Sequence, residues 1–304
     1  MYIKFRGKRH SIYDVAFNAF NATVMGILII FTMYPFLNTL AISFNEGIDA
    51  MRGGIRLWPR EFTLQNYQAV FVGGTIIRAF FVSVARTVLA AVINVFLTAM
   101  LSYCLTRKEY VLNKFITIAF VLTMYFNAGL IPTYHLIQNL GLLNSFWVYI
   151  IPAAISAFNV IVVRTFMNTI PESFIESAKL DGAGDFKIFM RIIFPLSKPA
   201  LAVVGMFTII FQWNNWFDTY LYAPGNQSLS TLQFELQKLL ASSFSQGTAQ
   251  RASTGLAGEM ASSMVTSITI QAAITVIAMV PILSVYPLLQ RYFIAGLNVG
   301  GVKE

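Results

Sequence analysis

Long intervals without a charged residue place the strongest constraint on what this chain can fold into. No Asp, Glu, Lys or Arg occurs in residues 15–45, 87–106, 115–163, 199–217 and 260–290. A helix that crosses a bilayer needs about 20 mostly apolar residues, and the interval 115–163 is long enough for two such helices. The sequence therefore predicts an all-α membrane protein with six spans, near residues 16–43, 77–105, 115–134, 145–168, 200–222 and 264–289.

The distribution of Lys and Arg predicts how these spans are oriented. The chain carries a net charge of +8 although only 11% of its residues are charged. Basic residues concentrate in segments 1–15, 107–114, 164–198 and 291–304, and fewer lie in segments 44–76 and 223–262. Because cytoplasmic segments of membrane proteins are rich in Lys and Arg, we expect both termini in the cytoplasm. A basic arm at 1–15 and a cytoplasmic tail at 291–304 would then flank a transmembrane domain at 16–290. Because the basic residues follow the membrane topology in this way, the net positive charge does not indicate a nucleic-acid partner.

Motifs of common enzyme classes are absent from the sequence. It contains no G-x-x-x-x-G-K-[ST], no H-E-x-x-H and no G-x-S-x-G. Two histidines and the single Cys104 support neither a metal site nor a histidine-dependent nucleophile, and one cysteine cannot form an internal disulfide. The first apolar run is too long for a cleaved signal, so we expect it to be retained as a span. We therefore expect no catalytic residue, metal or cofactor in this chain.

The polar stretch 171–199 lies between two apolar intervals and predicts a helix, a turn and a second helix. Pro171 suits the first turn of a helix, where its missing N–H has no cost. Gly182 is expected to end that helix in a left-handed conformation. The second helix would run from about Asp185 to Ile193 and be broken by Pro195. Both helices have an apolar face, so the hairpin is expected to dock against another surface.

This hairpin resembles the coupling loop of the membrane subunits of bacterial ABC importers. That loop carries Glu-Ala-Ala, a Gly four residues after the second Ala, and then Ile-x-x-Pro. The sequence matches this pattern, with serine in place of the first alanine, at Glu176-Ser177-Ala178, Gly182, Ile192 and Pro195.

The resemblance implies a type I ABC importer fold in a bacterial cell membrane. A homologous second permease would complete the pathway, two ATPase subunits would bind ATP and Mg, and an extracellular binding protein would deliver the substrate. The coupling loop 171–199 would dock on an ATPase, with Glu176 meeting a basic group there. The candidate coupling residues are Phe174, Ile175, Glu176, Ser177, Ala178, Asp181, Gly182, Ala183, Phe189 and Pro195.

Other segments resemble the carbohydrate branch of this family. Leu57-Trp58-Pro59 follows the first span as it does in sugar-importer subunits, and residues 126–132 resemble the family's Gly-Pro segment. The ending 296–304 is similar to that of the half of carbohydrate importers that resembles the second maltose permease subunit. The resemblance therefore implies import of a carbohydrate, and its subgroup implies an oligosaccharide.

Polar residues in or near the spans are candidates for the substrate pathway. Amides can bond to sugar hydroxyls and aromatic rings can stack on sugar rings, although Trp213 and Trp216 could equally be interface anchors. Any single intramembrane Asn could instead serve helix–helix hydrogen bonding. Arg86 could line the pathway, snorkel to the interface, or pair with an acid on a partner subunit. The candidate pathway residues are Tyr125, Asn127, Gln212, Asn214, Asn215 and Asp218.

Two further interpretations concern the outer loop and the mode of transport. The loop 223–262, with a short amphipathic helix at 232–240, could reach toward a binding protein or be a flexible connector. A stand-alone secondary transporter or channel for a small polar solute is the alternative to an importer subunit. It would need no ATPase, and the absence of an acid at mid-membrane disfavours ion coupling.

Overall fold

The computed structural model describes residues 2–5, 8–72, 74–107, 109–241 and 265–300. This part of the chain is helical apart from loops and one antiparallel hairpin, formed by strands β1 (Tyr2–Phe5) and β2 (Lys8–Ser11) in the expected basic arm. Residues 1–72 with 239–277 form one unit, and residues 73–238 with 278–304 form the other.

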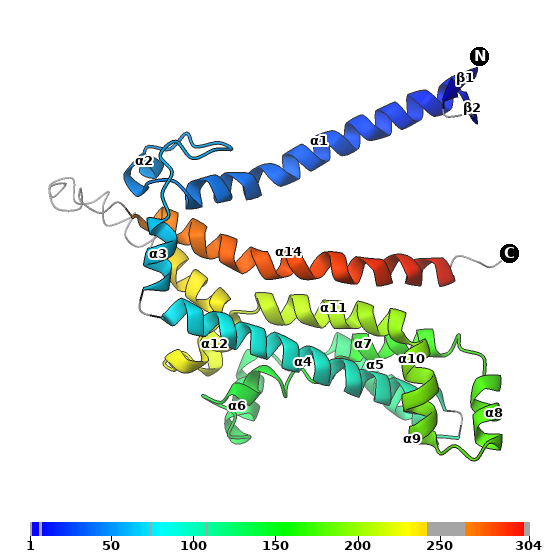
Figure 1. The fold of residues 1–304 in the computed structure, drawn as a ribbon. Coiled ribbons are helices and arrows are strands. Elements are labelled where there is room, and N and C mark those ends of the chain that lie inside the picture. Colours follow the sequence, from blue (N-terminus) through cyan, green and yellow to red (C-terminus); the bar gives the residue numbers. More distant parts are fainter. Residues whose placement is uncertain (1, 6–7, 73, 108, 242–264, 301–304) are drawn as a thin grey trace. The chain divides into compact units, whose positions relative to one another are not determined.

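The helices follow one another as Figure 1 shows. Their bounds are α1 Ile12–Ser43, α2 Gly47–Met51, α3 Gln65–Phe71, α4 Thr75–Thr106, α5 Asn113–Tyr125, α6 Leu130–Asn139, η1 Phe146–Tyr149, α7 Ala157–Met167, α8 Ser173–Leu180, α9 Asp185–Ile188, η2 Phe189–Ile193, α10 Phe194–Leu196, α11 Lys198–Asn214, α12 Phe217–Tyr222, η3 Gln227–Leu229 and α14 Ser267–Gly300.

In the first unit, the segment after α1 folds around the side chain of Asn45. Its Oδ1 accepts the backbone N–H groups of Arg60 (2.7 Å) and Glu61 (3.1 Å), and its Nδ2 donates to Asp49 Oδ2 over 2.9 Å. Arg60 Nε donates to the same carboxylate oxygen over 2.9 Å. The hydrogen bond from Asn45, and then that from Arg60, hold the pKa of Asp49 below its ordinary value although burial acts to raise it. The segment is thus an ordered substructure.

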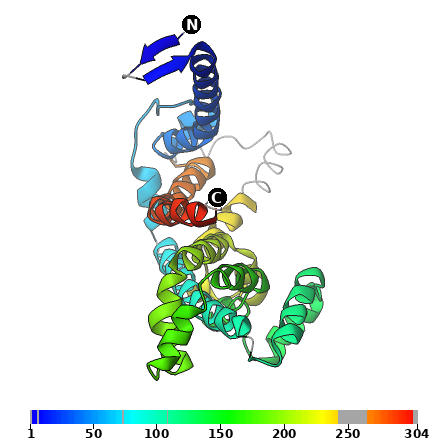
Figure 2. The same ribbon diagram turned by 90° about the vertical axis from the view of Figure 1, so that its right-hand side faces the viewer.

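The second unit is built on α4, α7 and α11, which pack on one another. Gly205 of α11 lies against Val95 of α4, and a Cβ at this position would be 3.2 Å from Val95 Cγ2. The small residue therefore permits the close approach of the two helices. Figure 2 shows that α5 and α6 project on one side of this core while the helices α8–α10 lie on another.

Three described helices are long and apolar enough to cross a membrane, namely 15–43, 75–106 and 267–284 within α1, α4 and α14. The bent pair 185–196 and 198–214 would make a fourth. The number of six spans remains a prediction. The helix of the last predicted span runs on to Gly300, through most of the segment expected as a tail. Residues 301–304 of that tail, and residues 242–262 of the expected outer loop, lie outside the described residues.

The predicted span at 115–134 is interrupted in the structure. Helix α5 ends at Tyr125, and α6 begins at Leu130. Between them, Asn127 Oδ1 accepts the backbone N–H of Gly129 over 2.8 Å, and Gly129 has a φ of +87°. A side-chain turn of this kind competes with the helix, and Gly is favoured where φ is positive.

The predicted spans at 145–168 and 200–222 are also interrupted. In the first, the 3₁₀ turn η1 is followed by an irregular stretch containing Pro152, and α7 begins only after Ser156, whose hydroxyl caps it. In the second, α11 ends at Asn214 and α12 begins at Phe217. Apolar composition alone carries no information about such breaks, which place polar backbone and side chains inside the unit.

Candidate functional sites: a polar cavity and a hairpin

A cavity of about 960 Å³ opens among the helices of the second unit. Its walls combine amide and hydroxyl side chains with aromatic rings, and its lining residues come from α4, α6, α7, α11, α12 and the segments between them. A cavity with many hydrogen-bonding groups and several ring faces matches the chemistry of a polyhydroxylated ligand. The amide and hydroxyl residues of the lining are Asn94, Asn127, Thr133, Ser156, Asn159, Thr208 and Asn215.

One side of the cavity is formed by three polar residues, one from each core helix. Thr208 Oγ1 of α11 donates to Asn94 Oδ1 of α4 over 3.0 Å, and Asn159 Nδ2 of α7 donates to the same oxygen over 3.1 Å. Asn94 Nδ2 donates to the carbonyl of Ala153 over 3.0 Å. Because all three side chains are buried and mutually bonded, they hold the three helices in one register. We call Asn94, Asn159 and Thr208 the polar triad.

A second side of the cavity is organised by Arg86, whose side chain has no exposed surface. Its Nε donates to Gln212 Oε1 (2.6 Å), its Nη1 to the carbonyl of Asn215 (2.8 Å) and its Nη2 to Asp218 Oδ2 (2.5 Å). The guanidinium carbon also lies 4.5 Å from the ring centre of Tyr149. Arg86 therefore pairs within its own chain, which removes any need for an acid on a partner subunit.

Asn215 and Asp218 are joined to each other as well as to Arg86. Asn215 Nδ2 donates to Asp218 Oδ2 over 2.9 Å, and the backbone N–H of Asp218 donates to Asn215 Oδ1 over 3.2 Å. The break between α11 and α12 makes this possible, because it turns both residues toward the cavity. Together with Arg86 they form what we call the arginine network.

The predicted pathway residues separate into three groups. Asn127, Asn215 and Asp218 line the cavity. Gln212 is buried behind it, where Nε2 donates to the carbonyl of Tyr149 over 3.0 Å. Tyr125 is 81% exposed and does not line the cavity. Asn214 lies on a different groove and donates to the carbonyl of Ile210 over 2.9 Å.

Sequence reasoning did not find Asn94 or Thr208 as cavity residues. Each lies within a long apolar run, and a single polar residue in such a run gives no sign of which face it occupies. The polar character of these two positions was the available signal, since a polar side chain within a membrane span needs a hydrogen-bonding partner. Only their convergence from helices far apart in the sequence identifies them as one group.

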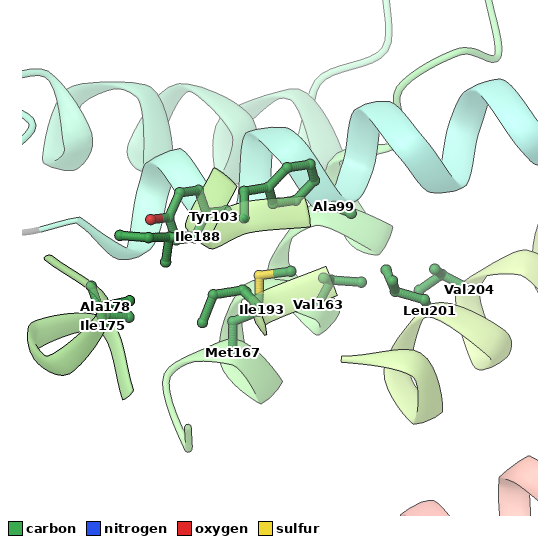
Figure 3. Packing of buried hydrophobic residues seen from close by; sticks show 11 residues of the cluster. Ala99, Tyr103, Val163, Met167, Ile175, Ala178, Ile188, Ile193, Leu201 and Val204 are labelled. Atoms are coloured by element: carbon green, nitrogen blue, oxygen red, sulfur yellow. The ribbon is translucent and has the colours of Figure 1, made fainter. Parts of the chain in front are cut away.

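The predicted hairpin is present, as α8 followed by the continuous helical segment α9–η2–α10. Gly182 ends α8 with a φ of +75°, as expected. Ile175 and Ala178 of α8 are buried in a cluster with Met167, Ile188 and other apolar side chains, and Figure 3 shows them pointing toward these neighbours. The face of α8 that carries Ile175 and Ala178 is thus already covered within this chain.

The coupling candidates therefore fall into an inner and an outer set. Ile175, Ala178 and Phe189 are buried inside the chain and Ala183 is partly covered. The outer set is exposed and consists of Phe174, Glu176, Ser177, Asp181 and Gly182. Phe186, whose ring centre lies 6.3 Å from that of Phe189, is 66% exposed.

Pro195 does not break the second helix of the hairpin, contrary to expectation. The backbone N–H of Phe194 bonds to the carbonyl of Phe189, which makes residues 189–193 a π-helical turn. Such a turn shifts the bonding pattern by one residue and leaves a carbonyl without a donor, which suits a following Pro that has no N–H. The break comes at Ser197, where the chain bends by 79° into α11.

One ion pair links the hairpin to the loop after α4. Lys179 Nζ lies 3.1 Å from Glu109 Oε1, and both side chains are largely exposed. The hydrogen bond that Lys179 donates to Glu109, and then the negative charge of Glu109, raise the pKa of Lys179. Exposed pairs of this kind are screened by water and contribute little to stability, so apolar burial dominates the attachment of α8.

Comparisons with known proteins extend over nearly the whole chain. No protein-family model matches it. It is 33% identical over 287 residues to the "polygalacturonan/rhamnogalacturonan transport system permease protein YtcP" of Bacillus subtilis, a match that covers 93% of this chain and 98% of that protein. It is 27% identical over 276 residues to the "arabinooligosaccharides transport system permease protein AraQ" of Halalkalibacterium halodurans, covering 89% and 91% of the two.

A solved structure matches as well. It is a bacterial ABC transporter involved in the import of the acidic polysaccharide alginate, and one of its chains superposes with a TM-score of 0.82 at 26% identity. The match covers 96% of this chain and 100% of that one. The helical arrangement described above is therefore shared with a protein of known structure.

Proposed function

Since this chain belongs to the permease subunits of ABC transporters for carbohydrates, we propose that its polar cavity is the part of a sugar-import pathway that this subunit supplies. As a permease of this family it is a multi-pass membrane protein, and ATP is hydrolysed by a separate subunit. A homologous second permease completes the pathway. Two ATPase subunits hold ATP and Mg, and an extracellular binding protein delivers the sugar.

The observation that carries this proposal is the attachment of the cavity and the hairpin to the same three helices. Asn159 lies one turn from Val163 on α7, and Thr208 lies one turn from Val204 on α11; Asn94 precedes Ala99 on α4 by little more than a turn. The first residue of each pair belongs to the polar triad. The second belongs to the apolar cluster that holds the hairpin. A movement of the hairpin that shifts α4, α7 and α11 would therefore also shift the polar triad, which lies about one helical turn away on the same helices.

We infer that the exposed and the buried residues of the hairpin have different functions. The exposed residues Phe174, Glu176 and Asp181 face an ATPase subunit, and Glu176 is placed to meet a basic group there. The buried residues Ile175 and Phe189 transmit its movement to α4 and α7. Close packing supports this role, because interdigitated apolar side chains move together and do not slide freely.

We also propose the topology, with six spans, both termini in the cytoplasm and the coupling loop 171–199 on the cytoplasmic side. The concentration of Lys and Arg in the basic arm and around the hairpin supports this orientation. The three interrupted spans support it too, since irregular backbone at membrane depth occurs where it lines a cavity. The outer segment 223–241 would face the binding protein; its Leu232 is buried, and the backbone N–H of Leu232 donates a hydrogen bond to Ser83 Oγ.

The substrate that fits this proposal is an oligosaccharide. A cavity of about 960 Å³ lies at the upper end of the range of about 300–1,000 Å³ that ligand pockets span. Its mixture of amides, hydroxyls and aromatic rings suits several sugar units. A stand-alone secondary transporter is the alternative, and it gains no support from the arginine network, since Arg86 and Asp218 neutralise each other.

Isolation of the chain from its native membrane in mild detergent tests the proposal. We expect a second permease and an ATPase to co-purify, and the ATPase activity to rise when sugar-loaded binding protein is added. A chain that purifies alone and transports a solute into liposomes without ATP would contradict the importer function. That result would favour the secondary transporter.

A further inference from the structure

A second pocket, of about 520 Å³, lies where the start of α5 meets the end of α7. Two of its lining residues are cations, Lys114 in the first turn of α5 and Arg164 in the last turn of α7. Among the described residues that line this pocket, none is Asp or Glu. The pocket is therefore positively charged and lies apart from the polar cavity.

Arg164 is held in place by neutral groups. Its Nη1 donates to Thr117 Oγ1 over 2.7 Å, and its Nη2 donates to Asn113 Oδ1 over 3.0 Å. Its Nε is buried without an acceptor, and no carboxylate in the described part of the chain forms an ion pair with it. A guanidinium that is oriented in this way keeps its full charge for an anionic ligand.

The nearby acidic side chain does not neutralise this pocket. Glu109, which precedes the lining segment, pairs with Lys179 over 3.1 Å. Lys114 is exposed, and none of the carboxylates that the structure describes forms an ion pair with it. Because Lys114 and Arg164 line the same pocket, a single anionic group placed there can interact with both.

An exposed apolar stripe begins at this pocket and follows α5. Ile118 lines the pocket, and Leu122 and Tyr125 continue on the face of the helix that carries Lys114, since residues three or four apart are neighbours. Their exposed fractions are 49%, 49% and 81%, so nothing in the unit covers them. At about 1.5 Å per residue, the face from Lys114 to Tyr125 is about 16 Å long, which is close to half of a hydrocarbon core of about 30 Å.

We propose that this pocket binds the phosphodiester headgroup of an anionic phospholipid, with an acyl chain along Ile118 and Leu122. A cationic pocket joined to an apolar stripe of one leaflet's length matches an amphiphile, whereas a free phosphate or an acidic side chain would leave the stripe uncovered. Basic pockets between helices on the cytoplasmic side recognise such headgroups. The site is separate from the sugar pathway, and only its assignment to the cytoplasmic leaflet rests on the proposed topology.

The test measures lipid binding to the complete purified transporter in an uncharged detergent by native mass spectrometry. The probes are dioctanoyl-phosphatidylglycerol, which is anionic, and dioctanoyl-phosphatidylcholine, which has the same chains and no net charge. We expect the anionic lipid to bind at least about tenfold more tightly, because each cation near a headgroup contributes about fivefold. Inorganic phosphate at the same concentration should not displace it.

Variants assign this binding to the pocket. Lys114→Gln removes one cation at an exposed position and should weaken binding of the anionic lipid about fivefold without changing that of phosphatidylcholine. Arg164→Gln should weaken it further, and Arg164→Lys should restore part of the loss because it keeps the charge without the planar fork. The matched controls Lys187→Gln and Arg191→Gln remove exposed cations outside the pocket and should bind as the unmodified transporter does.

Four results would overturn the lipid site. Equal binding of the two lipids, or unchanged binding in Lys114→Gln, would show that the pocket does not select an anionic headgroup. Displacement by inorganic phosphate would make it a site for a free anion. No binding of the anionic lipid would show that another subunit covers the pocket. None of these results decides the proposed function, which depends on co-purification of the ATPase and on its stimulation by loaded binding protein.

Discussion

Arg86 Nη2 lies 2.5 Å from Asp218 Oδ2, and the two residues are separated by 132 positions in the sequence. The arginine is fully buried while the aspartate reaches the cavity. A buried charge is tolerated only with a partner, so this pair ties α4 to the first turn of α12. It determines both the shape and the charge of that side of the cavity.

Removal of the partner acid should destabilise the protein strongly. In Asp218→Ala the guanidinium of Arg86 stays buried without a counter-charge, which costs on the order of 3 kcal/mol. The double variant Arg86→Met/Asp218→Ala should recover a large part of that loss, because no uncompensated charge remains. Apparent unfolding temperatures of the purified transporter measure both effects. Equal destabilisation in the single and double variants would contradict the role assigned to the pair.

Two adjacent hairpin residues should give opposite results. Ile175 is 3% exposed and Phe174 is 49% exposed. Ile175→Ala should lower stability by about 2–5 kcal/mol, as truncation of a buried side chain does. Phe174→Ala should leave the unfolding temperature nearly unchanged and reduce the stimulation of ATPase activity by sugar-loaded binding protein. A loss of stability in Phe174→Ala equal to that in Ile175→Ala would show that the inner and outer sets are misassigned.

The turn of the hairpin should depend on Gly182. Its φ of +75° is outside the range that Pro can adopt, so Gly182→Pro should abolish stimulation of the ATPase by loaded binding protein. Gly182→Asn is the matched control, since Asn tolerates this conformation better than other residues with a side chain. Stimulation at the unmodified level in Gly182→Pro would contradict a coupling function for the hairpin.

Acidification should loosen the segment that Asn45 organises. The pKa of Asp49 is lowered in the folded protein from its ordinary value of 3.8, so its contribution to stability is fully present above that value and is lost as the pH falls below it. Limited proteolysis between residues 44 and 62 should therefore be constant from pH 7 to pH 5 and increase only in stronger acid. Asp49→Asn should show more cleavage at neutral pH and little pH dependence. Increased cleavage of the unmodified protein already at pH 6 would exclude this explanation.

The sequence by itself determined the class of fold and the place of the hairpin. Intervals without charge can only be accommodated in a membrane or a large apolar core, and the pattern from Glu176 to Pro195 lies between two of them. Gly182 was identified in advance because a left-handed helix end is a local property of the backbone. Local signals of this kind act within a few residues and can be read without the fold.

Only the tertiary structure decided which residues meet. Asn94, Asn159 and Thr208 converge from three helices, and Arg86 finds Asp218 on a distant one. The same packing decided that Ala178 faces the interior and that the helix continues past Pro195 before it bends at Ser197. The physical reason is that a buried polar group takes whichever partner the packing of helices brings within about 3 Å, and helix packing depends on side-chain shape along the whole contact.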